Sequence, residues 1–522
     1  MAKNLKTPGV YIEEKNTLPN SIAEVATAIP AFVGYTEQAS MNGESLVNRP
    51  TRITSLADYE KLFGGAFSPK FILKDAGKGD INLVALGGRK MTIRRKNNSR
   101  AFLYHSIRLF YANGGGLCYI VSVGTYADKD FLDINKKDLL GSGNVGGLQS
   151  LLLEKEPTMI VVPDAVALGV DGYDVYRKVI EQCAKMKNRV AIIDICDGFD
   201  STDSGTGDSI NVFREKIGTE YLSYAAAYYP WLETNLVKKE EVTFKNLDES
   251  VSLEAILPET QAVVLVQEFP KSLEEFKTKL KSDRPELSDK AADVLSADYI
   301  EKSESDFHLR LSAISPTYVV LMDEIRSVMN LLPASAAMAG IYSMVDNSRG
   351  VWKAPSNVGL SSVIKPAINI THNQQEDFNV DTRSGKSINS IRTFPGVGTL
   401  VWGASTLDGN SLDWRYINVR RTMIMLEQSI NLALKAYVFE PNDANTWSTV
   451  KSLVSNFLMN KWKQGALAGS SPADAFDVQV GLGTTMTSVD ILEGKMLMSV
   501  KLAISRPAEF IVITFEQQMQ KP

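Results

Sequence analysis

Between residues 102 and 229, short β-type runs alternate with helical patterns, and this alternation constrains the fold more than any other feature. The runs are rich in Val, Ile, Ala and Tyr, and helical stretches at 147–154, 172–186 and 209–218 lie between them. Strand, helix and strand in succession form βαβ units, which build parallel sheets buried on both faces. The sequence therefore predicts an α/β domain with a mostly parallel sheet. Its predicted strands lie at 117–123, 158–162, 190–195 and 223–229.

A second block, from residue 394 to 515, has α+β character. Apolar stripes predict amphipathic helices at 420–437 and 446–464. Asn445 is placed to cap the second helix and Gly465 to end it. Apolar and polar residues alternate at 498–504, which predicts a strand with one covered face. The chain is therefore expected to contain more than one domain.

Both ends of the chain carry a β-type run that lacks a partner nearby in the sequence. The N-terminal run, Val10, Tyr11 and Ile12, follows a turn at Thr7-Pro8-Gly9. The C-terminal run is almost entirely apolar, which is typical of a strand covered on both faces. From the residues alone, pairing within the chain is favoured over pairing with another copy. The second run consists of Phe510, Ile511, Val512, Ile513, Thr514 and Phe515.

The segments between these blocks are less regular. A strand is expected at 28–35, where Pro30 suggests a sheet edge or a bulge. Residues 66–100 are expected to be irregular and carry a basic cluster. Residues 232–310 contain 18 acidic and 11 basic side chains, and we expect a solvent-facing elaboration with one strand at 262–266. Helical pattern follows at 271–281, and the Ser-, Asn- and Thr-rich stretch 356–393 is expected to form loops.

Composition excludes several classes of function. A net charge of −5 gives no general affinity for nucleic acid or anionic membranes, and the basic cluster lacks interleaved aromatic residues. The three cysteines lie far apart, which indicates reduced, buried thiols. The sequence has neither a signal peptide nor an apolar run long enough to span a membrane, so synthesis and assembly are expected in the cytoplasm.

The usual signatures of catalysis are weak. Histidine occurs only at positions 105, 308 and 372, which is too sparse for a metal cluster or a convincing Ser-His-Asp site. The glycines at 141–146 match a dinucleotide-binding pattern, but no strand is predicted before them, so we interpret them as a plain loop. Asp164 after a β-type run is interpreted as a strand-end turn rather than a ligand site. We therefore expect no enzyme activity, no cofactor and no metal.

Motifs spread over nearly the whole chain resemble those of contractile tail sheath proteins, which form the sheaths of phage tails and phage-tail-like contractile injection systems. Each motif is weak alone, but their joint order is specific. Ser405 stands where the family often has Arg, which leaves any ion pair at that position in doubt. The motifs are TPGVYIEE at 7–14, NGGGLCY at 113–119, VPD at 162–164, AYYPWL at 227–232, AG at 339–340 with Asp346, RGVWKAP at 349–355, FPG at 394–396, WGASTL at 402–407, WRYINVRR at 414–421 and RPAEFI at 506–511.

The resemblance implies a structural subunit that forms hexameric rings stacked helically around an inner tube. It also implies partners at the baseplate and the terminal cap, and a final location in a virion tail or injection particle. Terminal strands would add to a sheet in neighbouring subunits, which reverses the preference for pairing within the chain. The middle of the chain would form an inserted, subtilisin-like but non-catalytic outer domain. The expected division is 1–20 (arm), 21–100 (inner domain), 101–330 (outer domain), 331–505 (conserved inner domain) and 506–522 (arm).

The helix at 446–464 is the candidate for contact with the tube, through Lys451, Lys461 and Lys463. An ordinary core helix with solvated lysines is an equally good interpretation of this pattern. For the whole chain, the competing functions are a hydrolase that uses the α/β domain and a non-contractile filament or surface-layer protein.

Overall fold

The computed structural model describes residues 21–77, 82–96, 100–127, 129, 131–143, 145–200, 208–283, 289–379, 381 and 383–510. The chain forms two compact units. The described part of unit 1 contains residues 21–27, Asp346–Ala354 and 418–510, whereas unit 2 contains Ala28–Val345 and Pro355–Ile417. Neither of the domain boundaries expected near residues 100 and 330 is a boundary between the two compact units.

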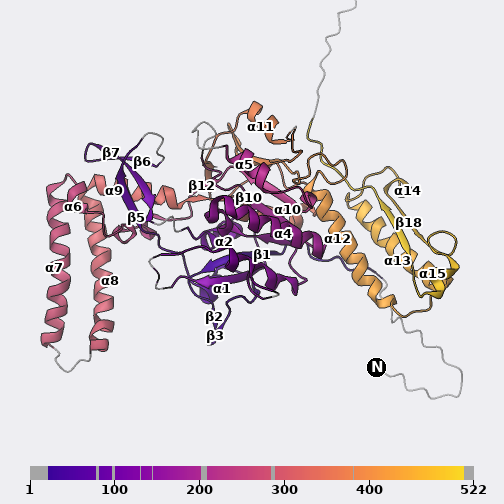
Figure 1. Cartoon of the computed structure of the whole chain (residues 1–522), viewed down its shortest axis with the longest axis horizontal. Coiled ribbons are helices and arrows are strands. Elements are labelled where there is room, and N and C mark those ends of the chain that lie inside the picture. The colour runs from indigo at the N-terminus through magenta and orange to yellow at the C-terminus, as the bar shows by residue number, and fades with distance from the viewer. Residues whose placement is uncertain are drawn as a thin grey trace, which may run out of the picture. The chain divides into compact units, whose positions relative to one another are not determined.

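Unit 2 is organised around a sheet that has nine strands within the described residues, in the order β14-β17-β16-β11-β10-β9-β1-β8-β4 (Figure 1). Neighbours from β16 to β8 pair in parallel, and antiparallel strands lie at both edges. Every residue of β9, β10 and β11 is buried. The predicted parallel, doubly covered sheet is confirmed. Its strands are β1 (Pro30–Thr36), β4 (Thr51–Ile53), β8 (Cys118–Thr125), β9 (Met159–Val161), β10 (Val190–Asp194), β11 (Ala225–Tyr229), β14 (Val358–Gly359), β16 (Asn389–Phe394) and β17 (Gly398–Trp402).

Strand β1 lies in the middle of this sheet, between β9 and β8. The prediction that Pro30 marks an edge or a bulge was therefore wrong. Pro30 is the first residue of the strand, a position where proline is tolerated inside a sheet. The register shift in the pairing with β8 comes later, between Gly34 and Thr36.

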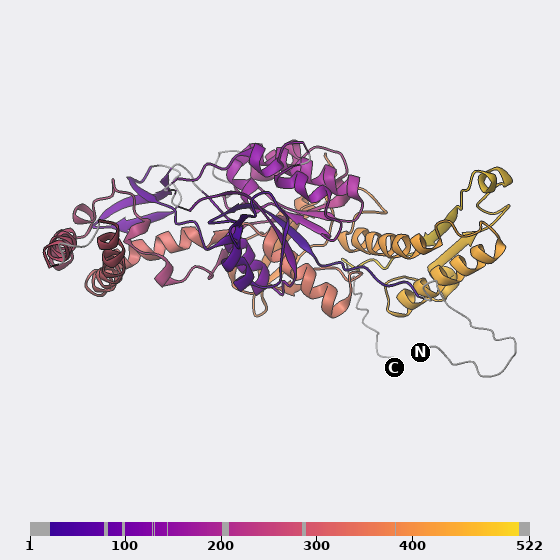
Figure 2. The ribbon, with the colours of Figure 1, turned by 90° about the horizontal axis from the view of Figure 1, so that it is seen from below.

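Helices cover both faces of the sheet (Figure 2). Helices α4 (Gly172–Met186) and α5 (Ser209–Lys216) follow β9 and β10, as predicted, while the expected helix at 147–154 is a 3-10 helix, Gly147–Leu152. Helices α2 (Leu103–Ala112) and α10 (Ser335–Arg349) pack closely against each other. A Cβ added at Gly340 of α10 would lie 2.6 Å from the carbonyl oxygen of Phe110, so only glycine permits this approach.

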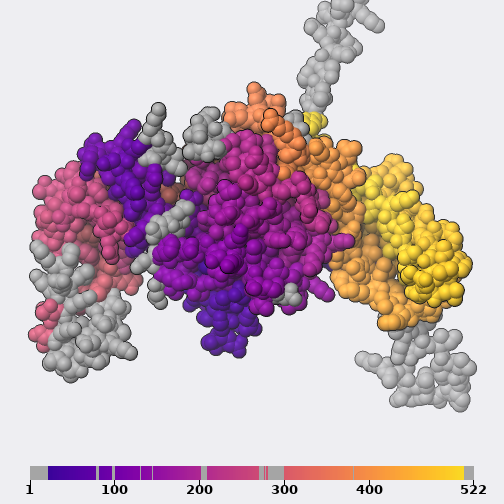
Figure 3. Space-filling view, viewed as in Figure 1, coloured from indigo at the N-terminus to yellow at the C-terminus, as the bar shows by residue number. Residues whose placement is uncertain are grey.

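An insert in unit 2 has more structure than the sequence predicted. Residues 66–100, expected to be irregular, contain the antiparallel strands β5 (Phe71–Asp75), β6 (Leu83–Leu86) and β7 (Arg89–Arg95). The expected strand at 262–266 lies inside helix α7 (Thr260–Asp283), which packs beside α8 (Asp289–Ile314). Together with α9 (Pro316–Met329), these elements share a core that includes Phe71, Ile93, Leu311, Leu321 and Ile325. In Figure 3 the purple surface of β5–β7 lies beside the pink surface of the helices.

The smaller elements of unit 2 correct one prediction. Helix α1 (Leu56–Phe63) begins with the Ser55 hydroxyl accepting from the Asp58 amide, and Gly64 ends the helix. Residues 356–393 are not all loop, since β14, β15, α11 and most of β16 lie there. The remaining elements are β2 (Ser40–Met41), β3 (Glu44–Ser45), α3 (Lys136–Leu140), β12 (Leu232–Thr234), α6 (Leu253–Ile256), β13 (Leu331–Leu332), β15 (Val363–Pro366) and α11 (His372–Asn379).

Unit 1 is built on the two predicted amphipathic helices, α12 (Ile417–Leu434) and α13 (Ala444–Lys463). Their apolar faces share a core that includes Leu426, Val450, Val454 and Leu458. The N-cap of α13 is Asp443, whose carboxylate accepts from two backbone amides, and not Asn445 as expected. The other elements of unit 1 are α14 (Pro472–Ala475), β18 (Phe476–Val480), α15 (Ser488–Leu492) and β19 (Met498–Leu502).

Candidate functional site

The first described residues of the chain, 21–27, lie against the core of unit 1. Ile22 is buried among side chains of α12 and α13. The Val25 amide donates to the Ser429 hydroxyl at 3.1 Å, which fixes the backbone of the segment on α12. Because these contacts join residues some 400 positions apart, unit 1 requires both ends of the chain.

A buried ion pair fastens the end of this segment. Arg421 of α12 donates through Nη1 to Oδ1 of Asp346 at 2.9 Å and through Nη2 to Oδ2 at 2.5 Å, and the side chains are only 4% and 3% exposed. Thr27 joins both partners, since its carbonyl accepts from Arg421 and its hydroxyl donates to Asp346 at 2.6 Å. Bidentate, charge-assisted bonds of this kind fix geometry strongly. The motif analysis singled out Asp346 and Arg421, but their pairing could not be deduced from it.

A second ion pair holds the segment against α13. Lys461 is 5% exposed, and its Nζ bonds to carboxylate oxygen Oε2 of Glu24 and to Gln464. The ammonium also lies 5.5 Å from the Trp352 ring and 5.8 Å from the Phe457 ring. The chain therefore uses Lys461 internally, and the expectation that it faces an inner tube was wrong, because the side chain turns toward the N-terminal segment.

Lys451 and Lys463, the other two candidates, are exposed on α13. They are therefore available to an external partner, whereas Lys461 is not. Their role in contact with a tube stays a prediction.

Unit 1 contains a small sheet whose two strands are both edge strands. Within the described residues it consists of β18 and β19 alone, paired antiparallel from Phe476–Leu502 to Val480–Met498. An edge strand offers unpaired backbone groups to another chain. Of the expected arm residues, Phe510 has no regular structure and is 77% exposed. The others, Val10, Tyr11, Ile12, Ile511, Val512, Ile513, Thr514 and Phe515, lie outside the described residues.

The three histidines of unit 2 lie in different surroundings. Burial lowers the pKa of His105 to about 4, and Nδ1 of His308 lies 2.8 Å from the Tyr318 hydroxyl. The side chain of His372 is 84% exposed, with Glu376 one helical turn away at 3.8 Å. In the part of the chain that the structure describes, no group of three or more His, Cys, Asp or Glu side chains could hold a metal ion. No described helix has the length and apolarity that crossing a membrane requires.

Asp164 lies at the start of the 3-10 helix Pro163–Asp171, which follows β9, and it organises the backbone around it. Its carboxylate accepts from the amides of Tyr35, Phe102 and Leu103, at 2.8, 2.6 and 3.1 Å. Burial raises its pKa to about 6, although these bonds act in the opposite direction. Because these amides belong to β1 and to the start of α2, Asp164 links the two elements. This contact pattern agrees with the predicted strand-end turn.

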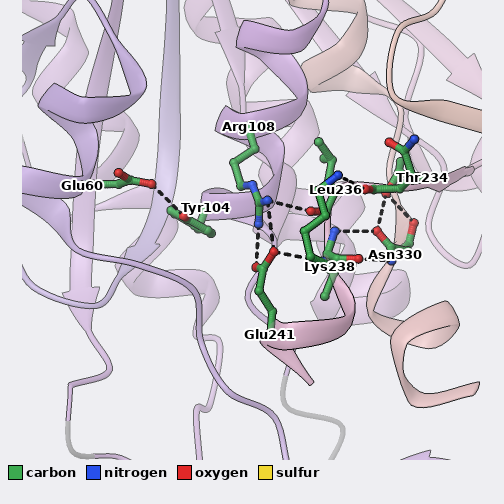
Figure 4. Close-up of polar contacts among 10 residues, drawn as sticks. Glu60, Tyr104, Arg108, Thr234, Leu236, Lys238, Glu241 and Asn330 are labelled. Carbon is green, nitrogen blue, oxygen red and sulfur yellow. Dashed lines mark hydrogen bonds and ion pairs between the residues drawn. The ribbon is translucent and has the colours of Figure 1, made fainter. Parts of the chain in front are cut away.

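Arg108 of α2 ties the sheet region to the chain that leads into the insert (Figure 4). Its guanidinium donates to both oxygens of Glu241, at 2.8 and 3.2 Å, and to the carbonyl of Leu236. Nearby, Asn330 accepts from the Thr234 hydroxyl and from the Val237 amide. These contacts hold the insert in position, and they need neither substrate nor cofactor to explain them.

The chain thus combines a mixed α/β body with a discontinuous unit of helices and a two-stranded sheet. Residues 410–518 match the family model described as the phage tail sheath C-terminal domain. The chain therefore carries that domain and is related to the tail sheath proteins, which confirms the resemblance found in the motifs.

Individual relatives agree with this assignment. The chain is 23% identical over 208 residues to the tail sheath protein of Enterobacteria phage T4, and 27% identical over 157 residues to that of Burkholderia phage BcepMu. These matches cover 39% and 29% of this chain, and only 30% and 32% of the phage proteins. The chain thus aligns with about a third of the length of its curated relatives.

Solved structures match over a much larger share. A chain of the sheath complex of PVC, an extracellular contractile injection system, in its contracted state is 28% identical, with a TM-score of 0.58 and 99% coverage of both chains. The contracted helical sheath of the anti-feeding prophage is 26% identical, with a TM-score of 0.58 and coverage of 98% of this chain and 100% of that one. The mixed α/β architecture is therefore that of contractile sheath subunits.

Proposed function

We propose that the chain is the repeating subunit of a contractile sheath, which polymerises helically around an inner tube and contracts to drive that tube through a target envelope. The observation that carries this proposal is the likeness, over 99% of both chains, to a subunit of the contracted PVC sheath. The proposed partners are further copies in stacked hexameric rings, the tube protein, and baseplate and terminal cap proteins. The proposed setting is a phage tail or an injection particle assembled in the cytoplasm.

Unit 1 is proposed as the conserved inner part that links subunits. Its segment 21–27 is fastened by the Asp346–Arg421 and Glu24–Lys461 pairs, so a strand N-terminal to it would leave from a rigid anchor. The β18–β19 sheet offers edges to which terminal strands of neighbouring copies could add. Contacts of this head-to-tail kind do not close on themselves and therefore generate helical polymers.

Unit 2 is proposed as the outer body, with a subtilisin-like arrangement that performs no catalysis. Its buried carboxylates and histidines serve the backbone and the core, as Asp164 and His308 illustrate. During contraction, rigid bodies of this kind would rotate and form new contacts while the strand links of unit 1 keep the lattice connected.

Electron microscopy of the purified chain tests the proposal, in the presence and absence of co-expressed tube protein. The full chain should form helical tubes, whereas a variant that ends before Glu509 and one that lacks residues 2–20 should remain single particles with unchanged circular dichroism. Full-length chains that stay monomeric with the tube protein present would contradict the sheath function. Tubes formed by both truncated variants would contradict the linking role of the arms but leave the sheath function standing.

The exposed lysines of α13 are tested separately. Lys451→Glu and Lys463→Glu should weaken sheath–tube association at low salt and leave the folding free energy within about 0.5 kcal/mol, because both side chains are exposed. Lys137→Glu, at an exposed position of α3 in unit 2, serves as the control. Unchanged association in both α13 variants would remove these lysines from the contact.

A further inference from the structure

A small cavity in unit 2 lies where the insert meets the sheet region. It measures about 20 Å³, slightly more than the space that one water molecule needs. Strand β7 contributes Arg95, the connection to α2 contributes Arg100, and α2 contributes His105. The rest of the lining is mainly apolar and consists of Phe67, Pro69, Ala101, Phe102, Met329 and Leu332.

Three nitrogen atoms of these polar residues lack a hydrogen-bond partner. Nε of Arg95, Nε of Arg100 and Nδ1 of His105 are each buried and unpartnered within the described structure. Buried polar atoms are nearly always satisfied, so each orphan requires an explanation. All three residues line the same cavity, so a single occupant is the simplest explanation for the three orphans.

The cavity also carries uncompensated positive charge. The Arg95 guanidinium donates to the Val328 carbonyl and lies 6.0 and 5.9 Å from the rings of Phe71 and Phe102. Among the described residues it forms no ion pair, and burial, followed by the charge of Arg100, lowers its pKa to about 9. Arg100 has one carboxylate nearby, that of Asp197 at 3.7 Å. Two guanidinium groups therefore share a single nearby carboxylate, and because both side chains are only partly exposed, water screens their repulsion incompletely.

We propose that this cavity binds a halide ion, chloride under cellular conditions, which accepts N–H bonds from Arg95, Arg100 and His105. The volume selects the ligand class. A monatomic anion fits about 20 Å³, whereas the five heavy atoms of phosphate or sulfate do not. The neutral form of His105 can donate from Nδ1, so the site needs no protonated imidazole.

The bound ion would have a structural role. Arg95 belongs to the antiparallel sheet of the insert, while His105 belongs to a helix packed on the nine-stranded sheet of the described residues. A halide between them fastens the insert to the sheet region at a point where two cations would otherwise repel each other. This proposal is independent of the sheath function, because it rests only on the interior of unit 2.

Bromide is the direct probe. Crystals of the full chain grown in sodium bromide should give an anomalous difference peak inside the cavity, about 3.2 to 3.5 Å from the three nitrogen atoms. A peak with the density and distances of a water molecule, and no anomalous signal there, would overturn the proposal.

The dependence of folding stability on chloride concentration gives an independent measurement. At ten times its dissociation constant, chloride should raise the folded-to-unfolded ratio of the full chain about elevenfold relative to gluconate at equal ionic strength. The chloride effect should disappear in Arg95→Gln and persist in Arg49→Gln, whose side chain is 62% exposed. If Arg95→Gln does not fold, Arg100→Gln replaces it in the same comparison. An equal chloride effect in the cavity variant and the control would refute the site.

Discussion

Asp346→Asn should destabilise unit 1 more than any surface substitution. The change keeps the size of the side chain and removes its negative charge, so the Arg421 guanidinium loses its buried counter-ion. Thr27 loses a charged acceptor at the same time, because its hydroxyl donates to this carboxylate. The three segments that meet here belong to different parts of the chain, so weakening one contact loosens all of them.

The expected magnitude follows from the burial of the pair. With side chains 4% and 3% exposed, removing one partner should cost about 3–5 kcal/mol. For a unit of this size, that loss lowers the melting temperature by roughly 6–20 °C. Calorimetry of the full chain should show a lower transition for unit 1 alone, and amide exchange should accelerate in residues 21–27.

Two further variants make the test decisive. Glu493→Gln breaks an exposed pair with Lys495, 2.5 Å long, in the same unit, and should change stability by less than about 1 kcal/mol. Replacing both partners with apolar residues, Asp346→Leu with Arg421→Met, should recover much of the loss, since no unpaired charge remains. A loss below about 1 kcal/mol for Asp346→Asn would refute the view that this pair anchors the segment.

The other predictions concern unit 2. Burial raises the pKa of Asp194 to about 6, so its stabilising contribution is complete at pH below about 4 and is lost as the pH rises through 6. In Asp194→Asn the amide oxygen can still accept from the Ser335 backbone amide, and the amide NH2 can donate to the Ser335 hydroxyl. Urea unfolding should therefore show the variant gaining roughly 2 kcal/mol over the native chain between pH 4 and 7, and a pH-independent difference would contradict this. Gly340→Ala should cost about 1–3 kcal/mol because its Cβ would meet the Phe110 carbonyl oxygen, while Gly116→Ala, with no atom within 4 Å, should be neutral; equal costs would contradict the packing argument.

Sequence reasoning succeeded where burial and periodicity agreed. The bounds of α4 were predicted to the residue, since its apolar face repeats at helical spacing between two fully buried strands. It failed at residues 262–266, because a short apolar run fits a buried strand and a helix equally well. It also failed at β7, where Arg89, Lys90 and Arg94 conceal a strand whose Met91 and Ile93 face the core of the insert.

The candidate site was less accessible to prediction. Lys461 was expected to face an inner tube or solvent, whereas it pairs with Glu24, which lies 437 positions earlier in the sequence. Nothing local signals a contact over that separation. The N-cap of α13 shows the same limit at short range, since Asp443 and Asn445 are both good caps and the backbone geometry alone selects Asp443.

The discontinuity of unit 1 has a consequence for synthesis on the ribosome. Residues 21–27 emerge first, yet α12 and α13 follow only after almost 400 further residues, a delay on the order of tens of seconds at ~5–20 residues per second. Unit 2 can fold during this delay, whereas Asp346 waits for Arg421 and Glu24 waits for Lys461. A nascent or prematurely terminated chain thus lacks the residues that complete unit 1.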